Sequence, residues 1–315
     1  MAETVLAVDL GKTGCRAALW VGEARVDGEA AGAPGLATPG GVIAAERAVL
    51  AVACPLLRAA GVTRVERACV GAAGAEATPD GSQDLAGRLA AGLPAAEVAV
   101  TSDAVTSHAG ALADGDGVIL AIGTGTVALA RSGMRLSRAD GWGPWLGDEG
   151  SGTWIGLCGL RAALRAHDER GPETALRAAA GRMFGPLAGI ARVVNDAATA
   201  ARFAPEVARA ASLGDAMARA ILERAAGHLA RAATGAASLV GLGPGAPCAV
   251  VGGLTRLDPL LMERLDELLQ DAGLSLVSPL GTSVDGAHLL ARRNDLPHEA
   301  HIVRHRLELQ AGAPD

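Results

Sequence analysis

Two segments of this chain repeat one arrangement, in which a turn rich in glycine and threonine joins two apolar runs. The first segment covers residues 4–21 and has its turn at Asp9–Gly14. The second covers residues 118–130 and has its turn at Gly123–Thr126. Each predicts a β-hairpin. Because the two segments lie more than 100 residues apart, they suggest a duplicated lobe.

The rest of the chain alternates strand and helix patterns, which is typical of α/β folds with helices covering the sheets. Helical periodicity and short apolar runs predict further elements in this order: a helix over 42–61, strands over 65–72 and 98–101, helices within 153–237, a strand over 248–251, and helices over 259–270 and 285–293. The charged remainder to Asp315 is expected to be a peripheral tail. We interpret its histidines as part of a solvated face rather than as metal ligands: His298, His301 and His305.

A chain of 315 residues exceeds what one hydrophobic core usually organises. We expect an N-terminal lobe of residues 1–113 plus about 285–310, and a C-terminal lobe of residues 114–284. The expected fold class is α/β, with a ligand bound in the cleft between the lobes.

Composition excludes several classes of function. The formal net charge of −6 leaves no broad cationic surface for nucleic acid. The five cysteines contain no CxxC pair, which favours reduced core thiols and a cytoplasmic location. The N-terminus does not resemble a signal peptide. The longest uncharged run, residues 236–254, is broken by Pro244 and Pro247, so we expect no membrane span.

The two turns are candidate phosphate sites, because glycines let backbone N–H groups face a phosphate and threonine adds a hydroxyl donor. Ordinary hairpin turns are the alternative. The first turn lacks Walker A spacing. Asp9 before it is a candidate for holding Mg²⁺ through water. The candidate phosphate-binding residues are Gly11, Lys12, Thr13, Gly123, Thr124 and Gly125.

Asp103 follows an apolar strand, at the end where open α/β sheets bind ligands. It could accept the proton of an attacking hydroxyl as a general base. Capping of a helix that starts near Ala104 is the alternative. We interpret His108, in the same helix, as structural.

The glycine-rich loop at residues 140–152 contains two tryptophans, whose faces suit a sugar ring, and two acids that could accept hydroxyls. The acids are Asp148 and Glu149. We interpret Trp145, taken singly, as a packing residue. Farther along the chain, Gly252–Gly253 follow a buried strand and could let the backbone approach an adenosine.

Taken in order, five motifs resemble the N-acetylglucosamine kinase family, within the BadF/BadG-type ATPases and the wider group of actin, hexokinase and Hsp70-like ATPases. They are VDLGKTGCRA, SDA, AIGTGT, GWGPWLGDEGSG and VVGGLTRLDPLL, and the resemblance spans roughly residues 4–293. It implies two ribonuclease-H-like lobes, ATP and Mg²⁺ as cofactors, and an N-acetylhexosamine as substrate.

The resemblance also implies roles for single residues. Asp103 matches the catalytic base, and the sugar-contacting positions match Trp142, Gly143 and Asp148. Asp9 and Thr13 match the first phosphate motif, Thr124 the second, and Gly252 with Gly253 the adenosine motif.

Two segments depart from the family pattern. Leu10 and Lys12 replace glycines of a first phosphate motif that usually reads DGGGT. We expect Lys12, the sole lysine, to reach the phosphates directly; a solvated side chain is the alternative. Pro39 stands near where the sugar kinases place an asparagine.

The expected reaction is phosphorylation of N-acetylglucosamine at its 6-hydroxyl. Glucosamine and N-acetylmuramic acid are alternative substrates. An activator ATPase of the BadF type is the alternative function. It would need cysteine ligands for an iron–sulfur cluster. A homodimer could supply a pair of them by bringing together the Cys158 residues of its two copies.

Overall fold

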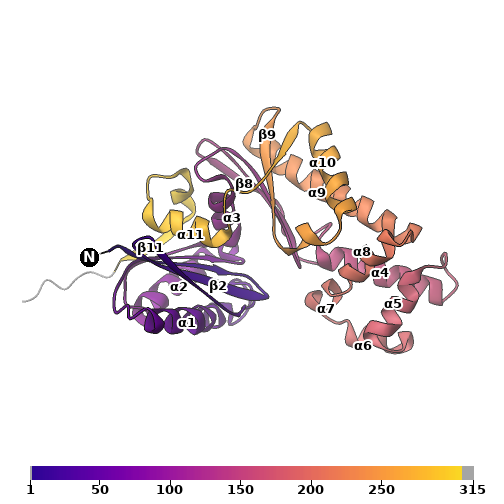
Figure 1. The fold of residues 1–315 in the computed structure, drawn as a ribbon, viewed down its shortest axis with the longest axis horizontal. Helices are drawn as coiled ribbons and strands as arrows, with labels where there is room; N and C mark the ends of the chain where they lie inside the picture. Colours follow the sequence, from indigo (N-terminus) through magenta and orange to yellow (C-terminus); the bar gives the residue numbers. More distant parts are fainter. Residues whose placement is uncertain (1, 307–315) are drawn as a thin grey trace, which may run out of the picture. The chain divides into compact units, whose positions relative to one another are not determined.

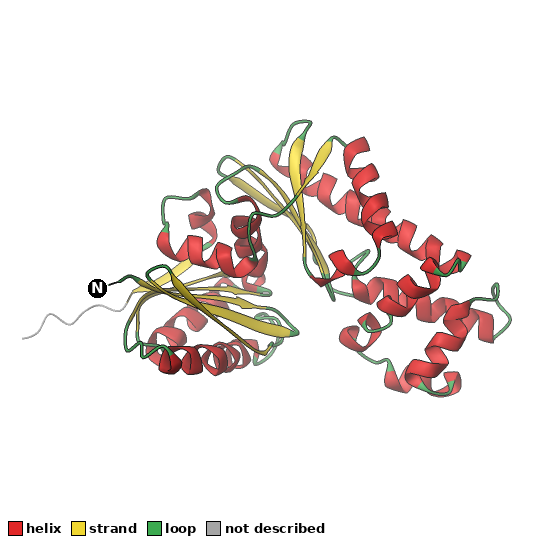
Figure 2. Ribbon diagram, viewed as in Figure 1, coloured by secondary structure: helices red, strands yellow, loops and turns green. Residues whose placement is uncertain are grey.

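The computed structural model describes residues 2–306 and divides them into two compact units (Figure 1). Unit 1 consists of residues 2–115 and 280–306, and unit 2 of residues Asp116–Pro279. Each unit is built on one mixed β-sheet with helices packed against it (Figure 2). The expected α/β class with two lobes is therefore confirmed.

Unit 1 contains a six-stranded sheet in the order β11-β5-β4-β1-β2-β3. Its strands are β1 Thr4–Leu10, β2 Gly14–Val21, β3 Ala24–Ala31, β4 Val65–Ala72, β5 Ala95–Ser102 and β11 Val303–Arg306. Its helices are α1 Gly41–Ala59, α2 Pro79–Gly92, α3 Asp103–Leu112 and α11 Ser283–Arg292, with short 3₁₀ helices η1 Ala75–Ala77 and η4 Pro297–His301. Figure 1 shows α1 and α2 on one face of this sheet and α3 and α11 on the other.

Unit 2 contains a five-stranded sheet in the order β10-β9-β6-β7-β8. Its strands are β6 Gly117–Ile122, β7 Thr126–Ser132, β8 Arg135–Asp140, β9 Ala246–Val251 and β10 Leu274–Val277. Its helices are α4 Gly152–His167, α5 Ala175–Phe184, α6 Ile190–Val193, α7 Ala197–Ala201, α8 Ala204–Ser212, α9 Ala216–Val240 and α10 Pro259–Asp271, with 3₁₀ helices η2 Leu187–Gly189 and η3 Gly253–Arg256.

The two sheets share one strand order, which confirms the predicted duplication. The order β5-β4-β1-β2-β3 in unit 1 corresponds to β10-β9-β6-β7-β8 in unit 2. Both predicted hairpins form, β1 with β2 and β6 with β7, and in both sheets the next pairing, with β4 or β9, is parallel. The carboxyl ends of β1 and β6 therefore occupy equivalent places in the two units.

The third strand of each lobe was not predicted, because neither carries a clear apolar alternation. Most residues of β3 are exposed, and β8 is only partly buried at the edge of its sheet. Pairing with β2 and β7 forms these strands despite their polar sequences.

The helical segment of unit 2 was predicted from one apolar stripe. In α9, Ile221, Ala225, Leu229 and Ala233 are buried. Helix α9 packs against β7 and β8 of the sheet, and also against α4, α8 and α10. The stripe thus anchors the additional helices to the sheet.

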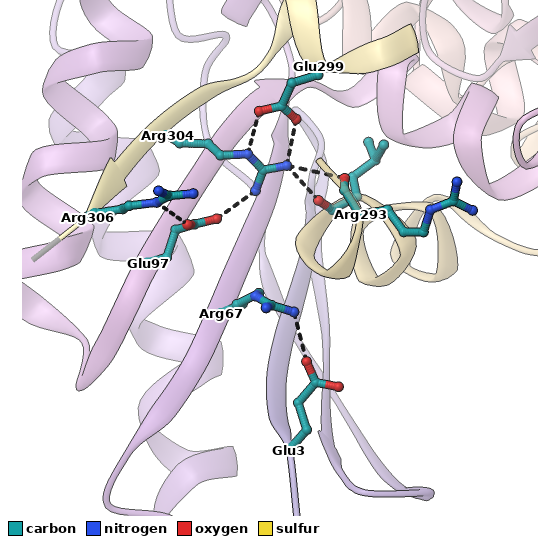
Figure 3. A network of polar contacts seen from close by, with 8 residues as sticks. Glu3, Arg67, Glu97, Arg293, Glu299, Arg304 and Arg306 are labelled. Atoms are coloured by element: carbon teal, nitrogen blue, oxygen red, sulfur yellow. Dashed lines mark hydrogen bonds and ion pairs between the residues drawn. The ribbon is translucent and has the colours of Figure 1, made fainter. Parts of the chain in front are cut away.

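The expectation of a peripheral tail after α11 is wrong for residues 294–306. Strand β11 pairs antiparallel with β5, and His298 of η4 is fully buried with its Nε2 3.0 Å from Nδ1 of His108. The charges that indicated a solvated face are instead paired. Arg304 binds Glu97 at 2.8 Å and both carboxylate oxygens of Glu299 at 2.7 Å (Figure 3). The remaining expected tail lies outside the described residues.

Candidate active site

Asp103 is the first residue of α3, directly after β5. Ser102 caps the helix by accepting the N–H of Val105 at 3.3 Å, so the alternative that Asp103 is the cap is wrong. The Asp103 carboxylate accepts the N–H of Ala104 at 3.0 Å and is half-buried. It lies at the carboxyl edge of the sheet, as predicted.

Burial, followed by the negative charges of Asp9 and Glu76, raises the pKa of Asp103 to about 7. The hydrogen bond from Ala104 and the charge of Lys12 act in the opposite direction. A carboxyl group with a pKa near neutrality can exchange a proton at ordinary pH, as a general base must.

Asp9 is the penultimate residue of β1, beside Gly71 of the parallel strand β4. Its Oδ1 accepts the hydroxyl of Ser283 at 3.0 Å. Burial raises the pKa of Asp9, although the Ser283 hydrogen bond and the charge of Arg16 partly oppose this. The parallel order of β5, β4 and β1 places Asp9 at the same edge of the sheet as Asp103.

Thr106 and Ser283 connect these two acidic positions, and sequence reasoning identified neither. Their hydroxyl oxygens lie 2.8 Å apart, and the Thr106 hydroxyl also lies 3.0 Å from the backbone carbonyl of Asp103. Thr106 and Ser283 are separated by 177 residues. No local spacing could have paired them.

The first glycine turn is tight and enclosed by backbone. The N–H of Gly11 donates to the carbonyl of Gly14 at 2.9 Å, and a Cβ on Gly32 would lie only 2.4 Å from the Gly11 carbonyl oxygen. Lys12 and Thr13 are exposed at the tip of the turn. The turn is thus held from behind, and its tip side chains face outward.

The second glycine turn, between β6 and β7, is held by the start of α4. The N–H of Gly152 donates to the carbonyl of Gly123 at 2.8 Å, and Thr153 donates its N–H and hydroxyl to the carbonyl of Thr124 at 3.1 and 2.7 Å. Gly252 has φ 103°, and a Cβ there would meet the Ile122 carbonyl oxygen at 2.3 Å. The Gly123–Gly125 turn and Gly252 therefore meet at the end of β6.

Asp140 and Asp148 fold the glycine-rich loop upon itself. Asp140 accepts the N–H groups of Asp148 and Glu149 at 2.7 and 3.0 Å, and Asp148 accepts the N–H of Gly143 at 3.2 Å. Asp148 is buried, and a Cβ on Gly125 would lie 2.6 Å from its Oδ2. The loop and the second glycine turn are therefore in direct contact.

The two tryptophans of this loop are exposed on unit 2. Trp145 is 82% exposed, so its interpretation as a packing residue is wrong. Trp142 is 67% exposed, with the guanidinium of Arg138 4.8 Å from its ring centroid. The carboxylate of Glu149 lies 2.9 Å from Nδ1 of His228 on α9.

The structure therefore groups the predicted site residues within each unit. Unit 1 brings together the end of β1, the first turn and Asp103, and unit 2 brings together the second turn, the tryptophan loop and Gly252.

Residues 2–306 contain no cluster of three or more histidine, cysteine or acidic side chains that could hold a metal ion. None of the helices in this range has the length and apolarity to cross a membrane. Cys158 is partly buried in α4.

These features define an α/β protein with a duplicated sheet and a glycine turn in each unit. At one sheet edge it carries a carboxyl group whose pKa is close to neutral pH. The chain belongs to the BadF/BadG/BcrA/BcrD ATPase family, whose model matches residues 6–291.

Comparison with individual proteins finds relatives by sequence and by structure. The chain is 38% identical over 111 residues to the N-acetylmuramic acid/N-acetylglucosamine kinase of Clostridium acetobutylicum, which covers 34% of this chain and 35% of that protein. It is 48% identical over 61 residues to the N-acetyl-D-glucosamine kinase of Dictyostelium discoideum, or 19% of each. The matches thus span 35% and 19% of the lengths of these relatives.

A crystal structure from Chromobacterium violaceum, provisionally described as an N-acetylglucosamine kinase, matches with a TM-score of 0.74 and 27% identity. The match covers 93% of this chain and 99% of that one. The chain therefore shares this fold over nearly its whole length.

Proposed function

We propose that this chain is an ATP-dependent carbohydrate kinase that phosphorylates an N-acetylhexosamine, with N-acetylglucosamine as the first candidate. Membership of an ATPase family supports the use of ATP. The names of the sequence relatives support an amino sugar as acceptor. The observation that carries the proposal is Asp103, a half-buried carboxyl at the sheet edge with a pKa raised to about 7.

In this proposal Asp103 is the general base. It takes the proton of the sugar 6-hydroxyl as that oxygen forms its bond to the γ-phosphorus, while the bond from that phosphorus to the departing ADP oxygen breaks. Because phosphoryl transfer needs little covalent help from the protein, the other residues act by position and charge. With its pKa near 7, Asp103 is substantially ionised at neutral pH and can accept the proton.

The proposal assigns phosphate binding to both glycine turns. Gly11, Lys12 and Thr13 present an exposed cation and hydroxyl in unit 1. In unit 2 the corresponding residues are Gly123, Thr124 and Gly125. Gly252–Gly253 are assigned to adenosine, because Gly252 packs against the Ile122 carbonyl while a Cβ on Gly253 would meet nothing within 4 Å, which leaves the backbone of Gly253 open to a flat ligand.

Asp9 is the residue proposed to hold Mg²⁺. Ser283 donates a hydrogen bond to its Oδ1, and an ionised carboxylate has about four acceptor sites. Mg²⁺ in phosphate sites is held by one or two carboxylates, with water and phosphate oxygens completing its shell. One carboxylate with spare acceptor sites fits this pattern, and bound Mg²⁺ would neutralise charge on the phosphates.

Sugar binding is assigned to Asp103 and the loop residues Trp142, Gly143, Asp148 and Glu149. Exposed aromatic faces suit the apolar face of a pyranose. Asp148 is buried within the loop against Gly125, so in this proposal it acts on the sugar from the inner side of the loop. Five free cysteines favour a reducing, cytoplasmic setting for the reaction.

A coupled ADP-release assay tests the function. The purified protein is given Mg-ATP with N-acetylglucosamine, N-acetylmuramic acid, N-acetylmannosamine, glucosamine or glucose. We expect the largest sugar-dependent rate with an N-acetylated sugar, and mass spectrometry should show one added phosphoryl group. ADP release that no sugar accelerates would refute the kinase assignment.

A further inference from the structure

Ser283 lies where α11 begins, and its hydroxyl points at the carboxylate of Asp9. The distance from Oγ to Oδ1 is 3.0 Å. Asp9 is the penultimate residue of β1 and Ser283 starts α11, so the contact joins residues 274 positions apart in the chain. A contact between such distant segments requires that the placement of α11 be well defined.

Several interactions fix the start of α11. Thr282 and Asp285 form a reciprocal capping box around its first turn. Asp285 also pairs with Arg25 of β3 at 2.6 Å. Because Arg25 and Asp285 both lie in unit 1, Ser283 is held against the sheet that carries Asp9.

A second hydroxyl, that of the fully buried Thr106, fixes the direction of the first. An ionised carboxylate only accepts hydrogen bonds, so the single proton of Ser283 must point at Asp9. The lone pairs of Ser283 then face Thr106, whose hydroxyl lies 2.8 Å away and shares its single proton between Ser283 and the backbone carbonyl of Asp103, 3.0 Å away. Thr106 lies against Gly71, where a Cβ would meet its Oγ1 at 2.2 Å.

We propose that Ser283 is a positioning residue that orients Asp9 for Mg²⁺, and that Thr106 keeps the Ser283 hydroxyl turned toward Asp9. This inference rests on the proposed function, which assigns the metal to Asp9. With Oδ1 held by Ser283, the carboxylate plane is fixed and Oδ2 is presented in one direction. Hydrogen bonds to charged groups are stronger than those between neutral groups, and networks of them reinforce one another.

The test measures metal binding without turnover. Mn²⁺, a paramagnetic substitute for Mg²⁺, is titrated into the protein with ADP and followed by electron paramagnetic resonance. We expect Ser283→Ala to weaken Mn²⁺ binding about tenfold, the size expected for one hydrogen bond to a carboxylate. Thr106→Val, which keeps the shape of threonine, should weaken it by about threefold, and Thr106→Ser should restore it.

Controls separate this role from a structural one. Ser212→Ala removes a helix hydroxyl in unit 2 that binds the Arg209 carbonyl, and it should leave Mn²⁺ binding unchanged. Wild-type affinity in Ser283→Ala, or a loss of thermal stability in that variant without weaker metal binding, would overturn the proposal. So would a wild-type protein that binds no Mn²⁺ with ADP. If Mn²⁺ binds as expected but no sugar accelerates ADP release, the kinase assignment fails and the role of Ser283 stands.

Discussion

Gly110 of α3 and Gly286 of α11 face each other where these two helices cross, and neither position has room for a side chain. A Cβ on Gly110 would lie 1.9 Å from the carbonyl oxygen of Thr282, and a Cβ on Gly286 would lie 1.9 Å from that of Thr106. This close approach brings Ser283 and Thr106 into hydrogen-bonding distance. Two glycines thus set the geometry around Asp9.

Gly286→Ala should force the helices apart, because backbone atoms cannot move aside as a flexible side chain can. We expect the free energy of unfolding to fall by about 1–3 kcal/mol, the usual cost of overpacking. ADP release should fall as well, since Ser283 moves with α11. Urea denaturation measures the first effect. Gly87→Ala in α2 is the matched control, because a Cβ there meets nothing within 4 Å; equal effects of the two changes would contradict the argument.

Asp103→Asn should remove the general base while keeping the size of the side chain. We expect kcat to fall by about 10²–10⁴-fold. ADP affinity should stay near wild type, because the glycine turns are unchanged. Asp80→Asn, at an exposed site in the first turn of α2, serves as control for the loss of one charge. Turnover near the wild-type rate in Asp103→Asn would show that another group accepts the proton.

The raised pKa of Asp103 should also appear in the pH dependence of stability. Between pH 4 and 7 the folded protein binds more protons at this site than the unfolded chain, whose aspartate has a pKa of about 3.9. The contribution of Asp103 to the free energy of unfolding therefore decreases as pH rises through this window. Urea denaturation at pH 5 and pH 8 should show a smaller loss in Asp103→Asn than in wild type. An identical pH dependence in both proteins would mean that the Asp103 carboxyl titrates normally.

The hairpins, the cap of α10 and the place of Asp103 at the sheet edge were predictable because their signals are local. Asp258 before Pro259, for example, caps α10 as its sequence indicates. The strand β11 was missed because its charges resemble those of a solvated tail, and their pairing with the distant Glu97 leaves no local signal. Ser283 and Thr106 were missed for a similar reason, since their meaning depends on a helix crossing that no short pattern encodes. The exposure of Trp145 depends on how Asp140 and Asp148 fold the loop.

Arg304 should be the most costly charge to remove from the network in Figure 3. Its side chain is 10% exposed and binds Glu97, Glu299 and the carbonyl of Leu290. Arg304→Met would leave two carboxylates without this partner, and we expect a loss of about 3 kcal/mol in the free energy of unfolding. Arg306→Met offers a matched control because Arg306 also binds Glu97 but is 67% exposed, so we expect a loss of about 1 kcal/mol or less. Similar losses in urea denaturation would show that burial does not govern this network.

Trp145→Ala should separate ligand binding from stability. The ring makes little contact with its own unit, so the free energy of unfolding should change by about 0.5 kcal/mol or less. Trp145 is exposed in the loop that is assigned to the sugar, so its removal should raise the KM for the preferred sugar by about two- to tenfold, while the KM for ATP stays unchanged. Met134→Ala is the control, because Met134 is 71% exposed at the β7–β8 turn, at the opposite end of β7 from the glycine turn. We expect no change in either KM there. An unchanged sugar KM in Trp145→Ala would remove this ring from the sugar site, whereas a large loss of stability would show that it packs against the protein after all.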